Sequence, residues 1–377
     1  MRVELPEPTP DERTHSERVA AAIRNEIVSA GGALDFARYM ELALYAPGLG
    51  YYSAGSTKFG AAGDFVTAPE LGFVFARCLA RALAPALREL GGGDVLELGP
   101  GSGALAVELL LELERLDALP RRYRLLERSA DLRDRQQTLM SQRCAHLLDR
   151  LEWLDAPPSG PWKGVLIANE VIDALPVHSL ALRDSGLFAR KVAIDAQGRF
   201  VWLEQPAERT LAQKVAQAIG NGLDSLPLPY VCEVCTMLEP WIIEVTRTLA
   251  HGSAFFFDYG YARGEYYHPQ RSAGTLRCHY RHRAHDDPLI LPGLQDITAW
   301  VDFDALAGSG EAAGFEVVAQ SMQAEFLIAH DLDGVFARAY TQATDEVVRY
   351  TLAQEVKRLT LPNEMGERFR VMALRRK

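Results

Sequence analysis

Residues 94–110, DVLELGPGSGALAVELL, combine a short apolar run, a cluster of glycines and an apolar segment of helix-forming residues. The apolar run before the first glycine is typical of a strand that is covered on both faces of a parallel sheet. Gly99, Gly101 and Gly103 allow a sharp turn and the close approach of a ligand to bare backbone. A ligand at this turn would also face the positive end of the following helix. The stretch therefore predicts a strand, turn and helix that bind a nucleotide-type cofactor.

The glycines alone do not identify the cofactor, because Gly99, Gly101 and Ala104 also match the weak dinucleotide pattern GxGxxG/A. Glu97 lies inside the expected strand, where a carboxylate is costly to bury unless a cation or a hydrogen-bond donor meets it. The ammonium group of S-adenosylmethionine is one such cation. Glu127 ends the next expected strand, YRLLE, where it can accept hydrogen bonds from both ribose hydroxyls. We therefore predict S-adenosylmethionine as the cofactor, with a nicotinamide dinucleotide and a purely structural glycine turn as alternatives.

Composition narrows the class of protein. The chain has 377 residues, 48% of them hydrophobic and 24% charged, which is typical of a globular protein with a main domain plus an insertion or cap. Its net charge of −10 argues against a nucleic-acid binder that works through a broad basic surface. No apolar run reaches the length of a membrane span, and the N-terminus resembles neither a signal peptide nor a transit peptide. We expect a cytoplasmic protein, and the sequence leaves its oligomeric state open.

The expected fold class is α/β, a Rossmann-like doubly wound sheet with an N-terminal helical region and an inserted antiparallel and loop subdomain. The domains are expected at 1–92 (helical cap), 93–176 (first part of the core), 177–250 (β-rich and helical insertion) and 251–377 (rest of the core, with a long substrate-side insertion at 261–300). Helices are expected at about 15–30, 34–44, 69–90 and 130–143, and core strands at 151–154, 164–168, 250–258 and 369–374. Three antiparallel strands are expected at 176–182, 187–195 and 200–204. The C-terminal part is expected to hold a helix, a strand pair and the final strand.

Cysteines and histidines give no strong metal signal. Cys232 and Cys235 form the CEVC motif, but the segment alternates like a strand, so the two side chains should point to opposite faces rather than form a redox pair. No second CxxC is present to complete a zinc site. Histidines also gather between His268 and His285, yet the arginines among them would oppose a cation. We predict no metal and expect this segment to be a structured lid or a peptide-docking loop, whose arginines pair with nearby acids.

Four long motifs resemble the MidA-like family. They are the glycine strand, GDFVTAPE at 63–70, IANEVIDALPV at 167–177, and the segment from FFDYGYARGEYYHPQ to GLQDITAWVDF, which ends at Phe303. The resemblance implies a class I methyltransferase that uses S-adenosylmethionine. It also implies that the acceptor is a protein arginine, as in mitochondrial members that act on a subunit of respiratory complex I during assembly. The chain departs from the family at 70–78, where ELGFVFARC replaces an expected polar stretch.

The motifs supply the candidate site residues. Asn169 and Glu170 follow a buried strand at its carboxyl end, where ligands bind in open α/β sheets. A guanidinium must be held in a planar, bidentate manner by carboxylates, and Glu170 and Asp173 are the candidates if a helical turn puts them on one face. The alternative is that Asp173 only caps the following segment.

The segment before the APE element supplies further candidates for the cofactor side. The resemblance implies that Gly63, Asp64 and Thr67 lie in a loop at the cofactor, whereas turn and helix-cap roles are the alternative. Rival functions for the whole chain are an NAD-dependent oxidoreductase, a small-molecule methyltransferase and a non-catalytic assembly factor that retains the cofactor fold.

Overall fold

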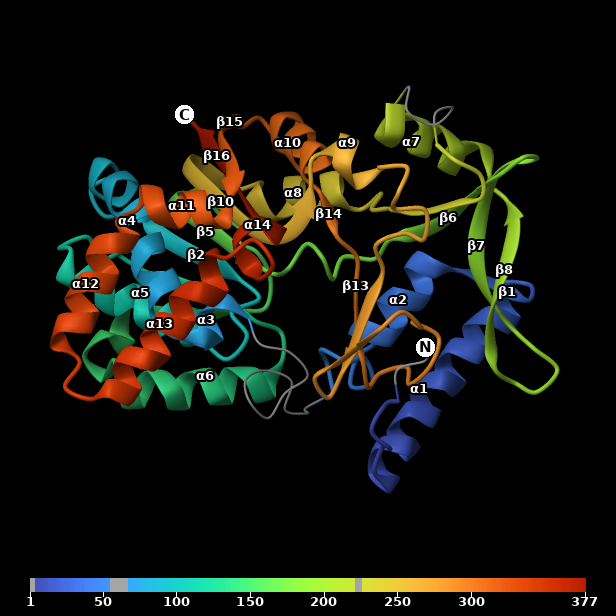
Figure 1. Ribbon diagram of the computed structural model, residues 1–377, viewed down its shortest axis with the longest axis horizontal. Helices are drawn as coiled ribbons and strands as arrows, with labels where there is room; N and C mark the ends of the chain where they lie inside the picture. The colour runs from blue at the N-terminus through green and yellow to red at the C-terminus, as the bar shows by residue number, and fades with distance from the viewer. Residues whose placement is uncertain (1–3, 55–66, 221–225) are drawn as a thin grey trace. The chain divides into compact units, whose positions relative to one another are not determined.

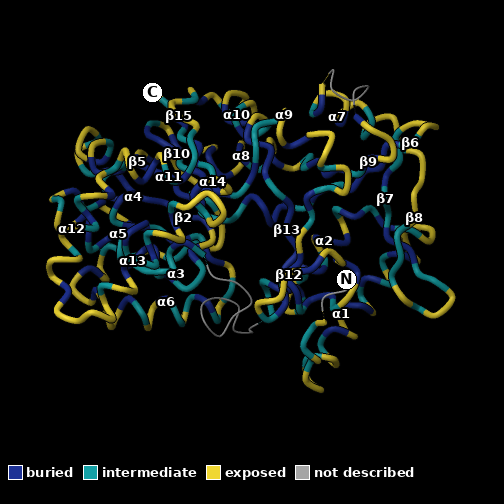
Figure 2. Tube along the Cα trace, in the orientation of Figure 1, coloured by how far each residue is buried: buried dark blue, intermediate teal, exposed yellow. Residues whose placement is uncertain are grey.

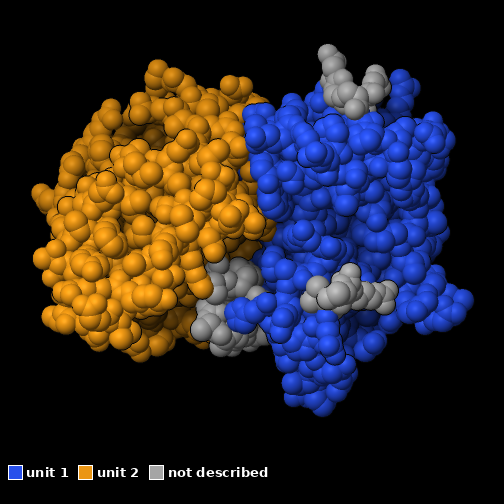
Figure 3. Space-filling model, viewed as in Figure 1, with its two compact units in different colours: residues 1–65, 173–238, 261–305 blue, residues 66–172, 239–260, 306–377 orange. Residues whose placement is uncertain are grey.

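The computed structural model describes residues 4–54, 67–220 and 226–377 (Figure 1). Its internal contacts divide the chain into two compact units, which Figure 3 shows in separate colours. Unit 1 contains residues 1–65, 173–238 and 261–305, and unit 2 contains residues 66–172, 239–260 and 306–377. Each unit is therefore assembled from three segments of the chain. The domain limits expected from the sequence stay predictions.

Unit 2 is built on one large sheet. Its strands lie in the order β4 (Leu151–Leu154), β3 (Tyr123–Leu126), β2 (Asp94–Leu98), β5 (Trp162–Asn169), β10 (Leu249–Tyr261), β16 (Phe369–Arg376) and β15 (Glu316–Met322). Strands β4 to β10 are parallel, whereas β16 is antiparallel to both of its neighbours. The chain moves outward from β2 through β3 to β4 and then continues on the other side at β5, so the strand order reverses between β2 and β5. Ligands of doubly wound sheets bind at this switch point, and the predicted fold class is confirmed.

Helices cover the sheet of unit 2. They are α3 (Ala68–Leu71), α4 (Val74–Glu89), α5 (Ala104–Arg115), α6 (Ala130–Arg143), the 3-10 helix η1 (Ala145–Arg150), α8 (Leu238–Thr246), α10 (Phe303–Ala312), α11 (Gln323–Ala329), α12 (Leu332–Gln342), α13 (Glu346–Thr360) and α14 (Met365–Arg368). In α4, Phe75, Leu79 and Leu83 recur every fourth residue and are fully buried. Phe75 meets Phe257 of β10 edge to face, with 5.1 Å between the ring centroids. Each such side chain contributes about 1.5–3 kcal/mol through burial, so this face fixes α4 on the sheet.

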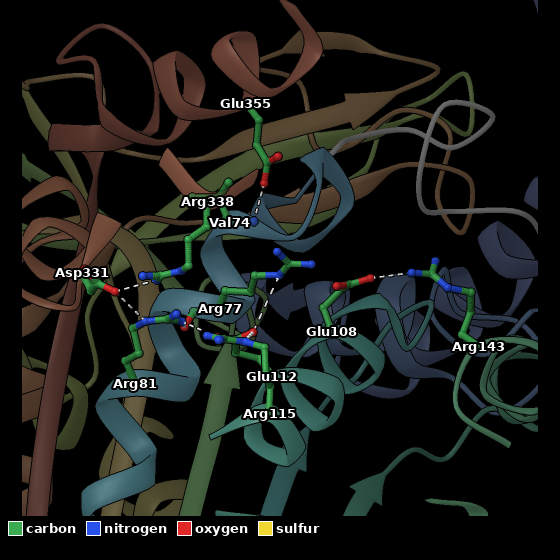
Figure 4. A network of polar contacts seen from close by, with 10 residues as sticks. All are labelled: Val74, Arg77, Arg81, Glu108, Glu112, Arg115, Arg143, Asp331, Arg338 and Glu355. Carbon is green, nitrogen blue, oxygen red and sulfur yellow. Dashed lines mark hydrogen bonds and ion pairs between the residues drawn. The ribbon is translucent and has the colours of Figure 1, made fainter. Parts of the chain in front are cut away.

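A network of ion pairs and hydrogen bonds joins α4 to α5, α12 and α13 (Figure 4). Glu112 of α5 is 3% exposed and lies 2.6 Å from the Arg81 guanidinium, with further pairs to Arg77 and Arg115. Arg81 also contacts Asp331, at the start of α12, at 3.0 Å. Glu355 of α13 accepts a hydrogen bond of 2.6 Å from the backbone nitrogen of Val74. Because Val74 begins α4, this buried carboxylate caps the helix from another part of the chain.

Two of the expectations for unit 2 are wrong. The single helix expected at 69–90 is two helices, because the chain breaks at Gly72 and Phe73 and Glu355 then caps a new start at Val74. A β-carbon at Gly72 would collide with the Glu355 carboxylate, which explains the glycine. The C-terminal part also contains the helices α11 to α14 between β15 and β16, where a simple strand pair was expected. Helices α12 and α13, labelled in Figure 1, both contact α4.

Unit 1 contains two smaller antiparallel sheets and several helices. The first sheet has the order β1 (Ala33–Asp35), β7 (Gly186–Ile194), β6 (His178–Arg183) and β9 (Tyr230–Val234), with β8 (Phe200–Pro206) paired to β7. The second has the order β12 (Arg283–His285), β11 (Arg277–Tyr280) and β13 (Asp296–Thr298). The remaining elements are α1 (Pro10–Ser29), α2 (Phe36–Tyr45), α7 (Arg209–Ile219), α9 (Arg263–Tyr266) and the short β14 (Val301–Asp302). The three predicted antiparallel strands are confirmed as β6, β7 and β8.

One detail of unit 1 differs from expectation. Helix α1 begins at Pro10, five residues earlier than expected, because Thr9 and Glu12 form a capping box at its start. The 261–300 insertion contains the second sheet and α9. Figure 2 shows buried stretches along β2, β5 and β10 and also in β13. Within the described ranges, no helix combines the length and apolar content that crossing a membrane requires.

Candidate active site

The glycine loop follows β2 and leads directly into α5. Gly99, Gly101 and Gly103 have φ angles of 58°, 55° and 85°, in the left-handed region that L side chains rarely adopt. A β-carbon at Gly103 would also lie 3.2 Å from Cγ of Gln136. The loop thus presents bare backbone at the start of α5. The N-cap residue of this helix is Gly103, which has no side chain to cap the first backbone N–H groups. The exposed backbone groups of this loop can make the polar contacts that a nucleoside cofactor needs. The predicted strand, turn and helix are confirmed.

Glu127 lies directly after β3, as expected, and is 8% exposed. Its Oε1 accepts a hydrogen bond of 2.8 Å from the backbone nitrogen of Ser129. Burial raises the pKa of Glu127, while the Ser129 N–H opposes this shift. The carboxylate is therefore held in one orientation at the end of a strand next to the glycine loop. That position suits the hydroxyls of a ribose, although the role itself stays a prediction.

Glu97 is 3% exposed in the middle of β2. The sequence requires a partner for this carboxylate, and the structure supplies the hydroxyl of Tyr123, which donates to Oε2 over 2.7 Å. Burial raises the pKa of Glu97 to about 7, and the tyrosine only partly opposes it. Sequence reasoning did not identify Tyr123, although tyrosine and glutamate lie on neighbouring parallel strands. A contact of Glu97 with the cofactor ammonium stays a prediction.

Asn169 and Glu170 lie at the carboxyl end of β5, next to the switch point. Glu170 has a φ angle of 53°, which is unusual for a residue with a side chain, and its backbone nitrogen donates to the carbonyl of Phe257 at 2.8 Å. Its Oε1 accepts hydrogen bonds from Asn169 Nδ2 at 3.1 Å and from the backbone nitrogen of Ala68 at 3.4 Å. Oδ1 of Asn169 is buried and has no hydrogen-bond partner among the described residues. The strand end therefore holds a fixed carboxylate beside an unsatisfied acceptor.

The expected helical turn after Glu170 is not formed. Residues 170–175 make bends and a turn, and the backbone nitrogen of Ile172 donates to the buried carboxylate of Asp258 at 3.0 Å. The helical spacing that would place Glu170 and Asp173 on one face is therefore wrong. Asp173 belongs to unit 1, is 5% exposed, and accepts a hydrogen bond from Ala299 through its backbone oxygen. Asp258 was not singled out from the sequence, although an acid directly after a buried apolar run is a usable signal.

The short helix α3 connects two parts of the site. Thr67 occupies the position before α3 and makes no side-chain cap, whereas Glu70 accepts a hydrogen bond from the Ser102 hydroxyl in the glycine loop. At the other end, the backbone nitrogen of Ala68 reaches Glu170. The APE element is thus hydrogen-bonded both to the glycine loop and to the end of β5. The candidates Gly63 and Asp64 lie outside the described residues.

The histidine and arginine segment of unit 1 is held by packing and ion pairs. Arg271 stacks on Tyr261, with 4.1 Å from its guanidinium carbon to the ring centroid, and Tyr261 in turn stacks on Trp300. Arg263 pairs with Asp302 at 3.2 Å, and Arg277 pairs with Asp286. Tyr266 and Tyr267 are buried in the core of this unit. These contacts fit the predicted arginine–acid pairing and assign both tyrosines to packing.

The histidine-rich segment and the CEVC motif both lie within the described ranges. In the described ranges, no group of three or more His, Cys, Asp or Glu side chains is placed to hold a metal ion. Cys232 and Cys235 are free thiols on or next to β9. Burial raises the pKa of both, to about 11 for Cys235, so neither thiol is activated at neutral pH.

Comparisons with known proteins agree with this site. The chain is 42% identical to a COG1565 superfamily protein from Burkholderia thailandensis whose crystal structure holds S-adenosyl-homocysteine, with a TM-score of 0.93 over 99% of this chain and 95% of that one. It is 28% identical over 381 residues to "Protein arginine methyltransferase NDUFAF7, mitochondrial" from Danio rerio, covering 92% of this chain and 84% of the relative. The Drosophila melanogaster homologue is also 28% identical, over 99% of this chain and 89% of its own length.

A family model described as "Putative S-adenosyl-L-methionine-dependent methyltransferase" matches residues 78–320, which include the glycine loop, Glu127 and the end of β5. The match confirms the family, the enzyme class and the cofactor predicted from the sequence. The match therefore favours S-adenosylmethionine over a nicotinamide dinucleotide as the ligand of the glycine loop. The chain is a member of this family of S-adenosylmethionine-dependent methyltransferases.

Proposed function

We propose that this protein transfers a methyl group from S-adenosylmethionine to the side chain of an arginine in a protein substrate. The relatives from Danio rerio and Drosophila melanogaster are named protein arginine methyltransferases, and the alignments cover most of both chains. The family resemblance further suggests a subunit of respiratory complex I as the target. Localisation in a cytoplasm stays a prediction.

The observation that carries the proposal is the pair of acceptors at the end of β5. Glu170 Oε1 is held by Asn169 Nδ2 and the Ala68 N–H, and Asn169 Oδ1 remains an unsatisfied acceptor among the described residues. A guanidinium carries only hydrogen-bond donors, and they are arranged in a planar fork. A carboxylate and an amide oxygen on adjacent residues are suitable partners for such a fork. An ionised carboxylate as methyl acceptor would bring only lone pairs, which these oxygens repel.

The chemistry requires alignment more than covalent help. S-Adenosylmethionine supplies an electrophilic methyl group on a sulfonium. A guanidinium nitrogen forms the new N–C bond as the C–S bond breaks, its proton passes to the Glu170 carboxylate and from there to solvent, and S-adenosylhomocysteine leaves. Asn169 and Glu170 would aim one nitrogen at the methyl and favour its proton loss. Asp173 is proposed as a second carboxylate on the family resemblance alone, because the turn that follows Glu170 is not helical.

On the cofactor side the proposal assigns the binding residues Gly63, Asp64, Thr67, Glu97, Gly99, Gly101, Gly103 and Glu127. Of the described members, Glu97 lies in β2, the three glycines follow β2, Glu127 follows β3, and Thr67 precedes α3. The left-handed glycines and the buried Glu127 support these assignments. Glu97 is assigned to the ammonium group because its buried carboxylate, which accepts a hydrogen bond from Tyr123, would be stabilised further by a cation.

The test is to locate the transferred methyl group. The purified protein is incubated with methyl-labelled S-adenosylmethionine and unmethylated complex I subunits, and the products are mapped by tandem mass spectrometry. Peptide pairs that differ only by arginine or lysine at the labelled position serve as the matched control. We expect label on a guanidino nitrogen and none on the lysine peptide. Label on lysine, on a carboxylate or on a small molecule would overturn the arginine proposal, and label on an arginine outside complex I would overturn the proposed target.

A further inference from the structure

Gln136 of α6 is a fully buried polar side chain that no site motif contains. Its amide makes three hydrogen bonds in unit 2. Nε2 donates to the carbonyl oxygen of Gly101 at 2.8 Å and to Oε2 of Glu127 at 3.4 Å, and Oε1 accepts from Trp153 Nε1 at 2.9 Å. One side chain therefore connects the glycine loop, the carboxylate after β3 and the end strand β4.

We propose that Gln136 is a positioning residue for the cofactor, which sets the glycine loop and the Glu127 carboxylate in their binding geometry without touching the methyl group. The inference rests on the cofactor roles proposed above for Gly101 and Glu127. Gln136 lies outside the glycine pattern, on helix α6, which follows β3.

The orientation of the amide has one solution. The indole nitrogen of Trp153 can only donate, so the amide oxygen of Gln136 must face it. Both hydrogens of the amide nitrogen are then directed at acceptors, the Gly101 carbonyl and Glu127. Three of the four hydrogen-bonding positions of this buried group are used, namely both N–H donors and one lone pair of the oxygen. A carboxylate at residue 136 would have no hydrogens for these acceptors, and an alkyl group would leave them unpaired in the interior.

The side chain also supports the loop by contact. A β-carbon added at Gly103 would lie 3.2 Å from Cγ of Gln136 and 3.4 Å from Cε of Met140. Gln136 therefore fills the space behind Gly103 while its amide holds Gly101. Moving it would shift the loop and release Glu127 together. In metal sites, removal of a residue that hydrogen-bonds to a ligand-binding group weakens the affinity by about 10- to 100-fold. We expect a loss of affinity near the lower end of this range when Gln136 is replaced.

The experiment compares the two ends of the same amide. Gln136→Leu removes the donors to Gly101 and Glu127, whereas Trp153→Phe removes only the donor to Gln136 Oε1. Each substitution breaks buried hydrogen bonds, so both should lower the melting temperature. Calorimetric titration with S-adenosylhomocysteine should show a dissociation constant raised about 10-fold for Gln136→Leu and less than about threefold for Trp153→Phe.

A double-mutant cycle with Glu127→Ala tests whether Gln136 acts through the carboxylate. If it does, Gln136→Leu should raise the dissociation constant less in the Glu127→Ala background than in the wild-type background. The two fold-increases should differ by a factor of at least about three. Gln136→Glu keeps the shape of the side chain and serves if the leucine variant fails to fold. At pH 8 it should bind S-adenosylhomocysteine about 10-fold more weakly, because a carboxylate cannot donate to Gly101.

Equal changes in affinity for Gln136→Leu and Trp153→Phe, or full additivity with Glu127→Ala, would overturn the proposal and leave a purely structural role. The titration needs no methyl acceptor, so its outcome is separate from the arginine proposal. If the wild type itself bound no S-adenosylhomocysteine, the cofactor assignment would fail and Gln136 with it.

Discussion

The ends of β3 and β5 lie on the same edge of the sheet in unit 2, but they differ in how their polar groups are satisfied. After β3, both oxygens of Glu127 have protein donors, from Ser129 and Gln136. After β5, Glu170 has a positive φ angle and the neighbouring Asn169 Oδ1 is a buried acceptor without a partner among the described residues. At the first end each carboxylate oxygen already has a donor and keeps one lone pair for a ligand, whereas the second end retains strain and an unsatisfied group.

The difference between the two strand ends fits a site in which each end binds a different ligand. A cofactor that is the same in every turnover is best met by groups held in advance, because ordering them during binding would weaken the affinity. An unsatisfied acceptor is costly to keep, and strained or orphaned groups concentrate at functional sites. We therefore propose that the β3 end binds the cofactor and that the β5 end binds the methyl acceptor.

The strongest way to break this comparison is to change the β5 end alone. Glu170→Gln and Asn169→Ala should each reduce the rate of methyl transfer by about 100- to 1,000-fold, as the loss of a preorganised charge-stabilising group does. The measurement is labelled-methyl transfer under saturating S-adenosylmethionine. Glu152→Gln, which changes a partly exposed acid on β4, is the matched control and should keep full activity. Retention of more than a tenth of the rate in Glu170→Gln would remove Glu170 from the acceptor site.

Stability as a function of pH sharpens the cofactor side. Burial in the folded state raises the pKa of Glu97 to about 7. Between about pH 4.5 and 7, Glu97 is therefore protonated in the folded protein but ionised in the unfolded chain. The cost of ionising Glu97 therefore appears as pH rises from about 4.5 to 7 and is fully present above 7. Glu97→Gln can still accept from Tyr123 but cannot ionise. Relative to the wild type, its unfolding free energy should rise by about 2–3 kcal/mol across that window.

Urea unfolding at pH 5 and pH 8 measures this difference. Because only the pH-dependent part is compared, any constant cost of the substitution cancels. Glu355, whose pKa burial also raises to about 7, is present in both proteins and cancels as well. A gap between Glu97→Gln and the wild type that does not change with pH would show that Glu97 titrates normally.

Changing the β3 end should affect binding rather than transfer. Glu127→Ala removes a carboxylate that is placed for two hydroxyl groups, and hydrogen bonds to charged groups contribute about 1.5–3 kcal/mol. We expect its dissociation constant for S-adenosylhomocysteine to rise about 10- to 100-fold. Asp155→Asn changes an exposed acid directly after β4 and should bind like the wild type. Normal affinity of Glu127→Ala would separate this carboxylate from the ribose.

The smallest effect is expected in the glycine loop. Gly103→Ala places a β-carbon at a φ angle of 85° and 3.2 Å from Gln136, which should cost about 1–2 kcal/mol of stability. Gly160→Ala is the matched control, because its φ is not in the left-handed region and its β-carbon would meet nothing within 4 Å. Thermal unfolding compares the two. Equal melting temperatures would show that the loop tolerates side chains and is less constrained than the φ angles indicate.

Sequence patterns predicted the parts of unit 2 whose residue types have a direct physical reason. The buried run before Gly99 and the acids Glu97, Glu127 and Glu170 were identified because apolar periodicity, glycine turns and buried charges are rare in combination. The sequence did not reveal Gln136 or Tyr123, since a single polar residue in a helix or strand has no distinctive spacing. Their roles depend on which strands become neighbours, which only the fold determines.

The C-terminal helices show a different limit. Val347, Val348 and Tyr350 of α13 are 68%, 53% and 66% exposed, so apolar residues occur on the outer face and blur the helical period. The side chain that anchors α13 to α4 is the buried acid Glu355, which an apolar pattern does not count. Similarly, the turn after Glu170 is not helical because Phe257 and Asp258 of β10 bind its backbone, a contact between segments far apart in the sequence.

The most direct test of the division between the two strand ends is the affinity of Glu170→Gln for S-adenosylhomocysteine, measured by calorimetric titration beside the wild type and Glu127→Ala. We predict a dissociation constant for Glu170→Gln within about threefold of the wild type, while Glu127→Ala binds at least about 10-fold more weakly. A loss of affinity in Glu170→Gln as large as that in Glu127→Ala would place Glu170 at the cofactor and contradict its assignment to the methyl acceptor.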